Sequence, residues 1–175
     1  MKVRVSARLV LVLAIAGTIG CDRVTKHLAT TTLAGTPSRS FLADTVRLDY
    51  VENTGGFLSL GASLPPAFRT VVFTICTGLM MLVLAGTAIR FRWRGAQLFG
   101  LTLFMAGGAS NWVDRLARGS VVDFLNVGLG PLRTGIFNVA DMAILIGLGI
   151  LFLCQLHRGK GSSEPPINSL PTPSI

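Results

Sequence analysis

One apolar segment near the C-terminal end decides the fold class: Phe137-Asn-Val-Ala-Asp141-Met-Ala-Ile-Leu-Ile-Gly-Leu-Gly-Ile-Leu-Phe-Leu-Cys-Gln-Leu156. After its polar start it carries no further charge, and its length approaches the ~20 residues that a helix needs to cross a bilayer core. Half of the 175 residues are hydrophobic, and the mean hydropathy is +0.62. These values exclude a disordered chain and are unusual for a soluble domain. The segment therefore predicts a membrane-spanning helix.

Three further segments are apolar enough to cross a bilayer. Together the four expected spans are residues 8–28, 69–89, 95–113 and 138–156. Loops rich in Lys and Arg remain in the cytoplasm, and basic residues precede the first span, separate the second from the third, and follow the fourth. These residues are Lys2, Arg4, Arg8, Arg90, Arg92, Arg94, Arg158 and Lys160. We therefore expect an α-helical integral membrane protein with four transmembrane helices and both termini in the cytoplasm.

The composition also bounds the partners and the number of domains. A formal net charge of +8 fits a membrane protein that faces anionic lipid. Nucleic-acid binding requires a basic face interleaved with aromatic residues. The sequence shows no such pattern, so nucleic acid is not expected as a partner. Cys21, Cys76 and Cys154 lie in apolar segments without paired spacing, so neither a metal site nor a disulfide framework is expected. One membrane domain should cover residues 1–158, and the Ser- and Pro-rich residues 159–175 should form a disordered cytoplasmic tail.

The first span has an alternative interpretation. A basic start, an apolar run and the phrase Thr18-Ile-Gly-Cys21 are similar to the signal peptide and lipid-attachment box of a lipoprotein. In that case Cys21 would become the lipidated N-terminus. Three further spans count against this interpretation, as does Thr18, because such boxes usually carry Leu there. A retained first helix is therefore expected.

Polar residues with helical spacing mark the outer ends of two spans. Asp22 and Lys26 are four residues apart and close enough to pair. They form either an interfacial salt bridge, with Lys26 reaching the headgroups, or a scaffold at the outer end of a site. Asn111, Asp114 and Arg115 share one face at the end of the third span. We interpret Asp114 and Arg115 as a structural ion pair, because a paired carboxylate stays charged, although Arg115 could also hold a phosphate or a carbonyl.

A small β-element is expected between the first two spans, over residues 38–66 and on the outer membrane surface. Residues 41–52 alternate partially between apolar and polar, which is typical of a strand. The turn signal Asn53-Thr-Gly55-Gly and a second short apolar run follow, as in a hairpin or half-barrel. Gly55 either supplies turn dihedrals or belongs to a strand edge that takes an extended peptide. Asn53 would then give its amide to a peptide backbone or to a catalytic carboxyl.

Two aspartates stand in short polar phrases beside expected spans: Gly119-Ser-Val-Val-Asp123-Phe and Phe137-Asn-Val-Ala-Asp141. An ionisable carboxyl at a membrane boundary is costly and marks a candidate functional site. Asn138 is a good N-cap, so Asp141 alone could be a capping residue stabilised by the helix dipole. That interpretation does not account for Asp123. Two carboxyls that meet would share one proton, as in an aspartic protease, with one activating water and the other protonating the scissile carbonyl.

With these residues together, the chain resembles the lipoprotein signal peptidases, the type II signal peptidases of bacteria. Five phrases match in the family's order across residues 8–156. They are Asp22-Arg-Val-Thr-Lys26, Asn53-Thr-Gly55, Asn111-Trp-Val-Asp114-Arg115, Val121-Val-Asp123-Phe124 and Phe137-Asn-Val-Ala-Asp141. Some positions depart from the usual pattern: Gly56 replaces Ala, Ser110 replaces Gly, Thr134-Gly135 replaces Trp-Pro, and Met142 replaces Ser. None of these departures removes a catalytic group.

The resemblance implies an aspartic endopeptidase of the bacterial inner membrane with its active site at the outer leaflet. Such an enzyme removes the signal peptide from diacylglyceryl-modified prolipoproteins, cutting just before the lipidated cysteine, and uses no metal and no cofactor. Its partners are prolipoprotein substrates and membrane lipid. Asp123 and Asp141 would be the catalytic dyad. The residues expected to bind substrate or support the site are Asp22, Lys26, Asn53, Gly55, Asn111, Asp114, Arg115, Asn138 and Ala140.

Two other functions stay open at this level. A serine/lysine peptidase would need Ser40 or Ser59 within hydrogen-bond reach of Lys26, and no spacing argues for that. A small four-span transporter or assembly subunit could use Asp123 and Asp141 for protons or for structure, without proteolysis. Cleavage of a peptide by the purified protein would separate the second alternative from an enzyme.

Overall fold

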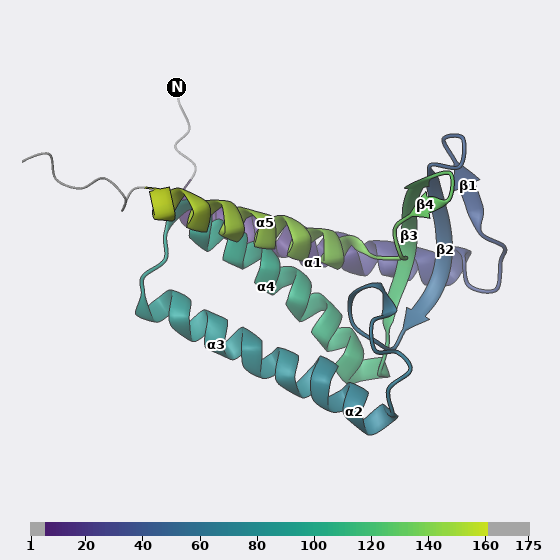
Figure 1. The fold of residues 1–175 in the computed structure, drawn as a ribbon, viewed down its shortest axis with the longest axis horizontal. Helices are drawn as coiled ribbons and strands as arrows, with labels where there is room; N and C mark the ends of the chain where they lie inside the picture. The colour runs from purple at the N-terminus through teal and green to yellow at the C-terminus, as the bar shows by residue number, and fades with distance from the viewer. Residues whose placement is uncertain (1–5, 161–175) are drawn as a thin grey trace, which may run out of the picture.

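The computed structural model describes residues 6–160 and is mainly helical. The helices are α1 (Ala7–Thr32), α2 (Pro66–Thr70), α3 (Thr77–Arg90), α4 (Gly95–Arg118) and α5 (Val139–Lys160), with the 3₁₀ turn η1 (Phe57–Ser59) before α2 and the π-helical segment η2 (Val71–Cys76) between α2 and α3. Strands β1 (Arg39–Phe41), β2 (Val46–Asn53), β3 (Val121–Leu129) and β4 (Leu132–Arg133) form a small sheet at one end of the helices (Figure 1).

Two helical segments are long and apolar enough to cross a membrane. They are Pro66–Arg90, which comprises α2, η2 and α3, and Val139–His157 within α5. α1 and α4 are of similar length, with 26 and 24 residues, but carry charged side chains in the turns nearest the sheet. Large apolar side chains such as Leu13, Leu82 and Phe152 are exposed on the helices, which is the surface that lipid-facing helices present.

Helix boundaries follow local sequence. Pro66 begins α2, where its missing N–H leaves no intrahelical bond unmade. α4 ends at Arg118, and the cap residue Gly119 follows with a φ of +73°, in the left-handed region that glycine adopts without strain. The Asn138 side-chain oxygen accepts the Asp141 backbone N–H at 2.9 Å, so the predicted N-cap of the last helix is confirmed.

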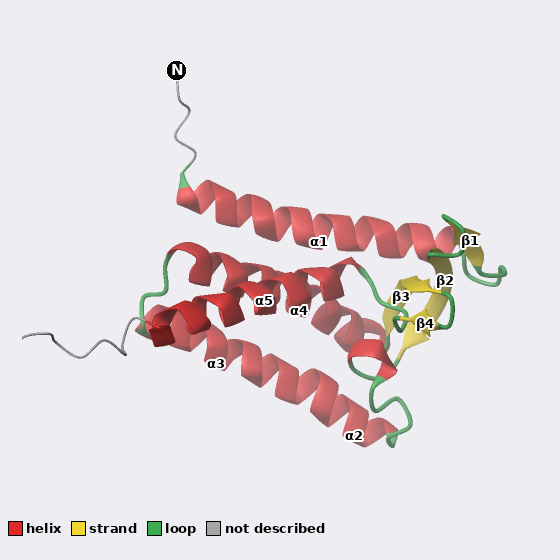
Figure 2. Cartoon of the chain, turned by 45° about the horizontal axis from the view of Figure 1, so that its top comes forward, coloured by secondary structure: helices red, strands yellow, loops and turns green. Residues whose placement is uncertain are grey.

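α4 packs closely against α5, and α1 lies beside both (Figure 2). Glycines allow this approach: a Cβ added at Gly107 would lie 2.4 Å from the Ala140 carbonyl oxygen, and one at Gly147 would lie 2.5 Å from the Gly100 carbonyl oxygen. The close approach predicted at residues 107–110 is therefore confirmed. η2 and α3 flank α4 on another side, where the Trp112 indole N–H donates to the Thr74 carbonyl at 2.7 Å.

The sheet has the antiparallel order β1-β2-β3-β4. β2 pairs with β3 so that Val46 lies opposite Val127 and Val51 opposite Asp123, with an irregularity between Leu48 and Val51. This register places Asp123 at the end of the sheet nearest the helices. The C-terminal end of α1 packs against β3, where Ala29, Leu33, Val122 and Phe124 form a small buried core.

The β-element expected at residues 38–66 contains β1 and β2 but lacks the longer strand that pairs with β2. The long partner of β2 is β3, which follows α4 in the sequence, and not a second strand of a local hairpin. The apolar run after Gly56 forms the turn η1, in which Leu58 and Ser59 have φ of +55° and +62° and therefore cannot continue a strand. The tail expected at residues 159–175 begins within α5, and from residue 161 it lies outside the described residues.

Candidate active site

β3 carries Asp123 into a buried position where only 2% of the residue is exposed. Each of its carboxyl oxygens accepts an amide N–H, one from Asn53 at 2.8 Å and the other from Asn138 at 2.6 Å. Burial raises the pKa of Asp123 to about 6, and the nearby Asp141 also raises it, although the two amide hydrogen bonds act in the opposite direction. Asp123 is therefore suited to hold a proton at mildly acidic pH.

Asp141 lies in the first turn of α5 and shares Asn138 with Asp123. The Asn138 backbone N–H donates to an Asp141 oxygen at 3.3 Å, while the Asn138 side chain caps the Asp141 N–H, an arrangement similar to a capping box. The Asn111 amide donates to the other Asp141 oxygen at 2.8 Å. Asn138 is fully buried, and its side chain donates to the Asp123 carboxylate and accepts from the Asp141 backbone N–H, so one residue links Asp123 to the first turn of α5.

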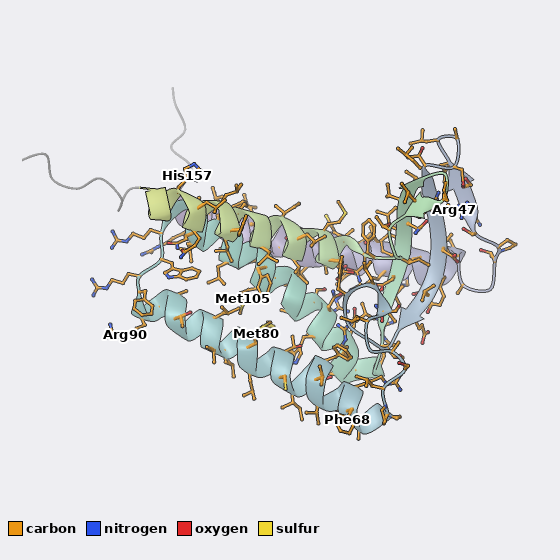
Figure 3. All side chains as sticks on the ribbon, in the orientation of Figure 1. Arg47, Phe68, Met80, Arg90, Met105 and His157 are labelled. Carbon is orange, nitrogen blue, oxygen red and sulfur yellow. The ribbon has the colours of Figure 1, made fainter. Side chains whose placement is uncertain are left out.

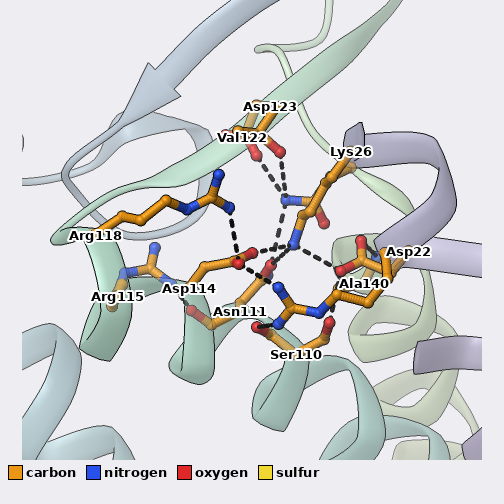
Figure 4. A network of polar contacts seen from close by, with 12 residues as sticks. Asp22, Lys26, Ser110, Asn111, Asp114, Arg115, Arg118, Val122, Asp123 and Ala140 are labelled. Carbon is orange, nitrogen blue, oxygen red and sulfur yellow. Dashed lines mark hydrogen bonds and ion pairs between the residues drawn. The ribbon is translucent and has the colours of Figure 1, made fainter. Parts of the chain in front are cut away.

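A buried ammonium fixes the orientation of Asn111. Lys26 donates to the Asn111 side-chain oxygen at 2.7 Å, to Asp114 at 2.7 Å and lies 2.6 Å from Asp22 (Figure 4). Because the oxygen of the Asn111 amide faces Lys26, its NH₂ group faces Asp141. The predicted pairing of Lys26 with Asp22 is confirmed. Because Lys26 is only 3% exposed, the alternative in which its side chain reaches the headgroups is wrong.

Asp22 joins three helices beside Asp141. It accepts a hydrogen bond from the Ser110 hydroxyl at 2.6 Å and another from the Ala140 backbone N–H at 2.9 Å. Ala140 is fully buried and precedes Asp141 in α5, and Ser110 precedes Asn111 in α4. Asp22 therefore holds the first turn of α5 in place against α1 and α4 through the backbone of Ala140.

The predicted ion pair between Asp114 and Arg115 is wrong. Asp114 instead pairs with Arg23 at 2.5 Å, Lys26 at 2.7 Å and Arg118 at 2.9 Å. Adjacent side chains on a helix point in different directions, whereas residues four apart are neighbours. Sequence reasoning missed Arg23, Arg118 and the Ser110 hydroxyl. The four-residue spacing from Asp114 to Arg118 was the available signal for one of them.

Arg115 binds the turn that follows β2. It donates to the Gly55 carbonyl at 2.6 Å, and its guanidinium lies 5.9 Å from the centre of the Phe73 ring. The Gly55 N–H in turn donates to the Asn53 side-chain oxygen at 2.9 Å. Gly55 is not among the residues with positive φ, so its turn-dihedral interpretation is wrong. A Cβ there would lie 2.5 Å from the Leu60 carbonyl oxygen, and glycine is needed for this close approach.

A family model described as signal peptidase (SPase) II matches residues 12–157. The chain belongs to the signal peptidase II family. It is 36% identical over 161 residues to the lipoprotein signal peptidase of Desulforapulum autotrophicum, covering 91% of this chain and 98% of the relative. It is 29% identical over 140 residues to that of Streptococcus pneumoniae, covering 80% and 88%.

A solved structure described as a bacterial membrane enzyme has the same fold as this chain. The TM-score is 0.77 at 22% identity, covering 91% of this chain and 94% of the other. A second such structure gives a TM-score of 0.71 at 24% identity, covering 84% and 92%. The helical bundle with a small sheet at one end is therefore the architecture of known membrane enzymes.

The geometry around Lys26 argues against a serine/lysine mechanism in this chain. The Lys26 ammonium has three N–H donors, and Asp22, Asp114 and Asn111 each lie within 2.7 Å of its nitrogen. The Ser40 hydroxyl donates to Asp44 at 2.6 Å in the exposed part of the sheet. A lysine held in this way has no free donor or lone pair with which to activate a serine.

Proposed function

We propose that this protein is an aspartic endopeptidase that removes the signal peptide from diacylglyceryl-modified prolipoproteins, cutting before the lipidated cysteine. The observation that carries the proposal is the pair of buried aspartates, Asp123 and Asp141, bonded to one Asn138. Membership of the signal peptidase II family supports the substrate class. No metal or cofactor takes part in the proposed reaction.

The surroundings of the two carboxyls favour different protonation states. Asp141 lies at the N-terminus of α5, where the helix dipole favours negative charge, and it accepts hydrogen bonds from Asn111 and Asn138. Burial raises the pKa of Asp123 to about 6, and because the dipole favours the charge on Asp141 the scheme places the shared proton on Asp123. In this scheme Asp141 is the general base and Asp123 is the general acid.

The proposed reaction then proceeds in two steps, after which both carboxyls regain their starting protonation states. Asp141 takes a proton from water, the oxygen attacks the carbonyl carbon of the scissile bond, and Asp123 gives its proton to the carbonyl oxygen. In the tetrahedral intermediate the C–N bond breaks, Asp141 returns a proton to the leaving amine, and Asp123 recovers its proton from the hydroxyl group. Asn53 and Asn138 hold Asp123 in one orientation through both steps.

An apolar cavity along α4, the helix that also carries Asn111 and Arg115, suits the lipid part of such a substrate. It has a volume of about 430 Å³ and lies between the η2–α3 segment and α4, with Gly78, Met81, Leu82, Met105 and Trp112 among its lining residues. Arg115 and the Asn53–Gly55 turn lie at the sheet end of the same helices. In this arrangement the acyl chains occupy the cavity while the peptide crosses between the turn and the dyad.

The proposed topology has four spans in the bacterial inner membrane, both termini in the cytoplasm, and the dyad at the outer leaflet. The sheet, labelled by Arg47, lies at one end of the helices, and Arg90 at the end of α3 lies at the other end (Figure 3). The exposed basic residues Arg90, Arg92 and Arg94 at the α3–α4 turn favour the cytoplasmic side. Reporter fusions after Ser63 and after His157 should report opposite sides of the membrane, and the same side for both would contradict four spans.

Cleavage by purified protein in detergent tests the proposed function. A synthetic precursor with a diacylglyceryl cysteine should be cut, and mass spectrometry should find the intact lipid on the new N-terminal cysteine of the product. The same peptide without the lipid is the matched control and should be cut much more slowly. A folded protein that leaves the lipidated precursor uncut would contradict the proposal and favour a transporter or an assembly subunit.

A further inference from the structure

We propose that the groove between α1 and α4 binds the phosphodiester headgroup of an anionic phospholipid. This proposal rests on the membrane placement in the proposed function. The groove has a volume of about 330 Å³ and is lined by Arg23, His27, Thr30 and Arg118, with Lys26 and Asp114 at its base. Lys26 and Asn111 stand between Asp114 of the groove and Asp141 in the hydrogen-bond network.

The groove has a surplus of positive charge. The ion-pair network at its base contains three cations and two carboxylates: Arg23, Lys26 and Arg118 against Asp22 and Asp114. Within these direct ion pairs the cations outnumber the carboxylates by one, and the next carboxyl, that of Asp141, is linked to Lys26 through Asn111. A phosphodiester carries one negative charge and would balance the excess among the groove's own ion pairs.

The two arginines can still donate hydrogen bonds. A guanidinium group has five N–H donors. Among the described residues, Arg23 uses donors for Asp114 and the Ser110 carbonyl, and Arg118 uses one for Asp114. Their side chains are 39% and 46% exposed. The network therefore fixes the position of both guanidinium groups and leaves further N–H donors for a ligand in the groove.

The depth of the groove matches the headgroup region. At 1.5 Å per residue, Arg23 lies about 24 Å and Thr30 about 35 Å along α1 from Ala7, so they bracket the edge of a hydrocarbon core that is about 30 Å thick. The neighbouring side chains Val24 and Leu28 on α1 are 59% and 52% exposed. Basic residues beside lipid-facing apolar residues at this depth are suited to bind a phosphate whose acyl chains lie along the helix.

The chemistry separates this ligand from the substrate. A diacylglyceryl cysteine carries acyl chains and a thioether but no phosphate, so it offers no anion to Arg23 and Arg118. A bilayer phospholipid offers both an anion and acyl chains. The groove would therefore hold a resident lipid that stabilises α1 against α4, the two helices that supply Lys26 and Asn111 to the site.

Lipid titration of the full chain in detergent tests the proposal without any substrate. Dioleoyl phosphatidylglycerol should bind saturably and raise the unfolding temperature, and dioleoyl phosphatidylcholine should bind more weakly. Arg23→Gln and Arg118→Gln should each weaken phosphatidylglycerol binding about fivefold, because a basic residue near anionic lipid contributes about that factor. Arg47→Gln, in the sheet, is the control and should bind as the wild type does.

A second variant keeps the test independent of folding. His27 is exposed and lines the groove, and it makes no side-chain contact with Asp114 among the hydrogen bonds and ion pairs of the described residues. His27→Glu should therefore leave the unfolding temperature in lipid-free detergent unchanged while it weakens phosphatidylglycerol binding at least fivefold. Wild-type affinity in this variant would overturn the proposal.

Two further outcomes would also overturn it. The first is equal affinity for phosphatidylglycerol and phosphatidylcholine, which would mean that the groove does not recognise a negative charge. The second is inorganic phosphate that binds as tightly as the lipid, which would mean a site for a free anion. Asp123→Asn should bind phosphatidylglycerol as the wild type does, so a loss of proteolysis and a loss of lipid binding are distinguishable.

Discussion

Replacement of Lys26 by Met tests whether the buried ammonium holds the site together. Met is similar in length and apolar, so the change removes the charge and its contacts to Asp22, Asp114 and Asn111. Asp22 would keep the Ser110 hydroxyl and the Ala140 N–H. Asp114 would keep its two arginines, and the Asn111 oxygen would keep only a 3.3 Å contact from Asn138.

The expected cost follows from these remaining partners. Removal of one partner of a buried ion pair costs about 3–5 kcal/mol, because a buried charge is left uncompensated. Since both aspartates keep other partners, we expect the lower end, about 3 kcal/mol. For a chain of this size that corresponds to a decrease in the unfolding temperature of about 6–12 °C. Asn111 would also lose the contact that orients its amide toward Asp141, so the turnover number should fall.

Unfolding by sodium dodecyl sulfate in mixed micelles measures this free energy. The double variant Lys26→Met with Asp22→Asn should recover part of the lost stability, because it removes one uncompensated charge. Arg94→Met, at an exposed basic residue in the α3–α4 turn, is the matched control and should be near neutral. A loss below about 1 kcal/mol for Lys26→Met, or a double variant that is no more stable than Lys26→Met, would refute the network's role.

Three further changes test other parts of the site. Asp123 keeps its proton up to about pH 6 in the folded protein and up to about pH 4 in the unfolded chain. Between these pH values the folded state binds the extra proton, so the contribution of Asp123 to the free energy of unfolding should fall by up to about 3 kcal/mol as pH rises from 4 to 6. Asp123→Asn should remove that pH dependence, and an unchanged pH profile would contradict it. Ser110→Ala removes a hydrogen bond to the Asp22 carboxylate, and denaturant titrations should show a loss of about 1.5–3 kcal/mol in the free energy of unfolding. A loss of less than about 0.5 kcal/mol, which is the scatter of neutral surface changes, would contradict the role of this hydrogen bond. Gly55→Ala would push a methyl group against the Leu60 carbonyl and should lower proteolytic turnover. The control Gly17→Ala, whose added methyl group would have no atom within 4 Å, should leave turnover unchanged. Equal turnover in the two variants would argue against close packing at the turn.

Local sequence predicted much of the site because its residues follow helical spacing. Asp22 and Lys26 are four residues apart, and Asn138 lies three residues before Asp141, so each pair could be read without knowledge of the fold. The contact from Asn53 to Asp123 joins residues 70 positions apart and depends on the pairing of β2 with β3. Partial alternation in β2 indicated a strand but not its partner.

The rest of the ion-pair network could not be assigned from sequence because it depends on helix packing. Asp114 was paired with its neighbour in the sequence, Arg115, yet the cations that reach it come from α1 and from the next turn of α4. Gly107 on α4 sets the distance to α5, but the face of α1 that meets α4 is the one that carries Arg23 and Lys26 to Asp114. Arg115 instead turns toward Gly55, in a loop whose position the sequence did not indicate.

Cleavage of a diacylated precursor by the two single aspartate variants and the double variant tests the central claim most directly. Asn at position 123 or 141 keeps the shape of the side chain but cannot exchange the proton that water attack requires. General acid–base catalysis contributes about 10²–10⁴-fold per group, and groups that act as a unit lose activity non-additively. Asp123→Asn, Asp141→Asn and the double variant should all bind the lipidated precursor and be nearly inactive, with the double variant scarcely slower than either single one. Substantial cleavage by either folded single variant would contradict an aspartic mechanism.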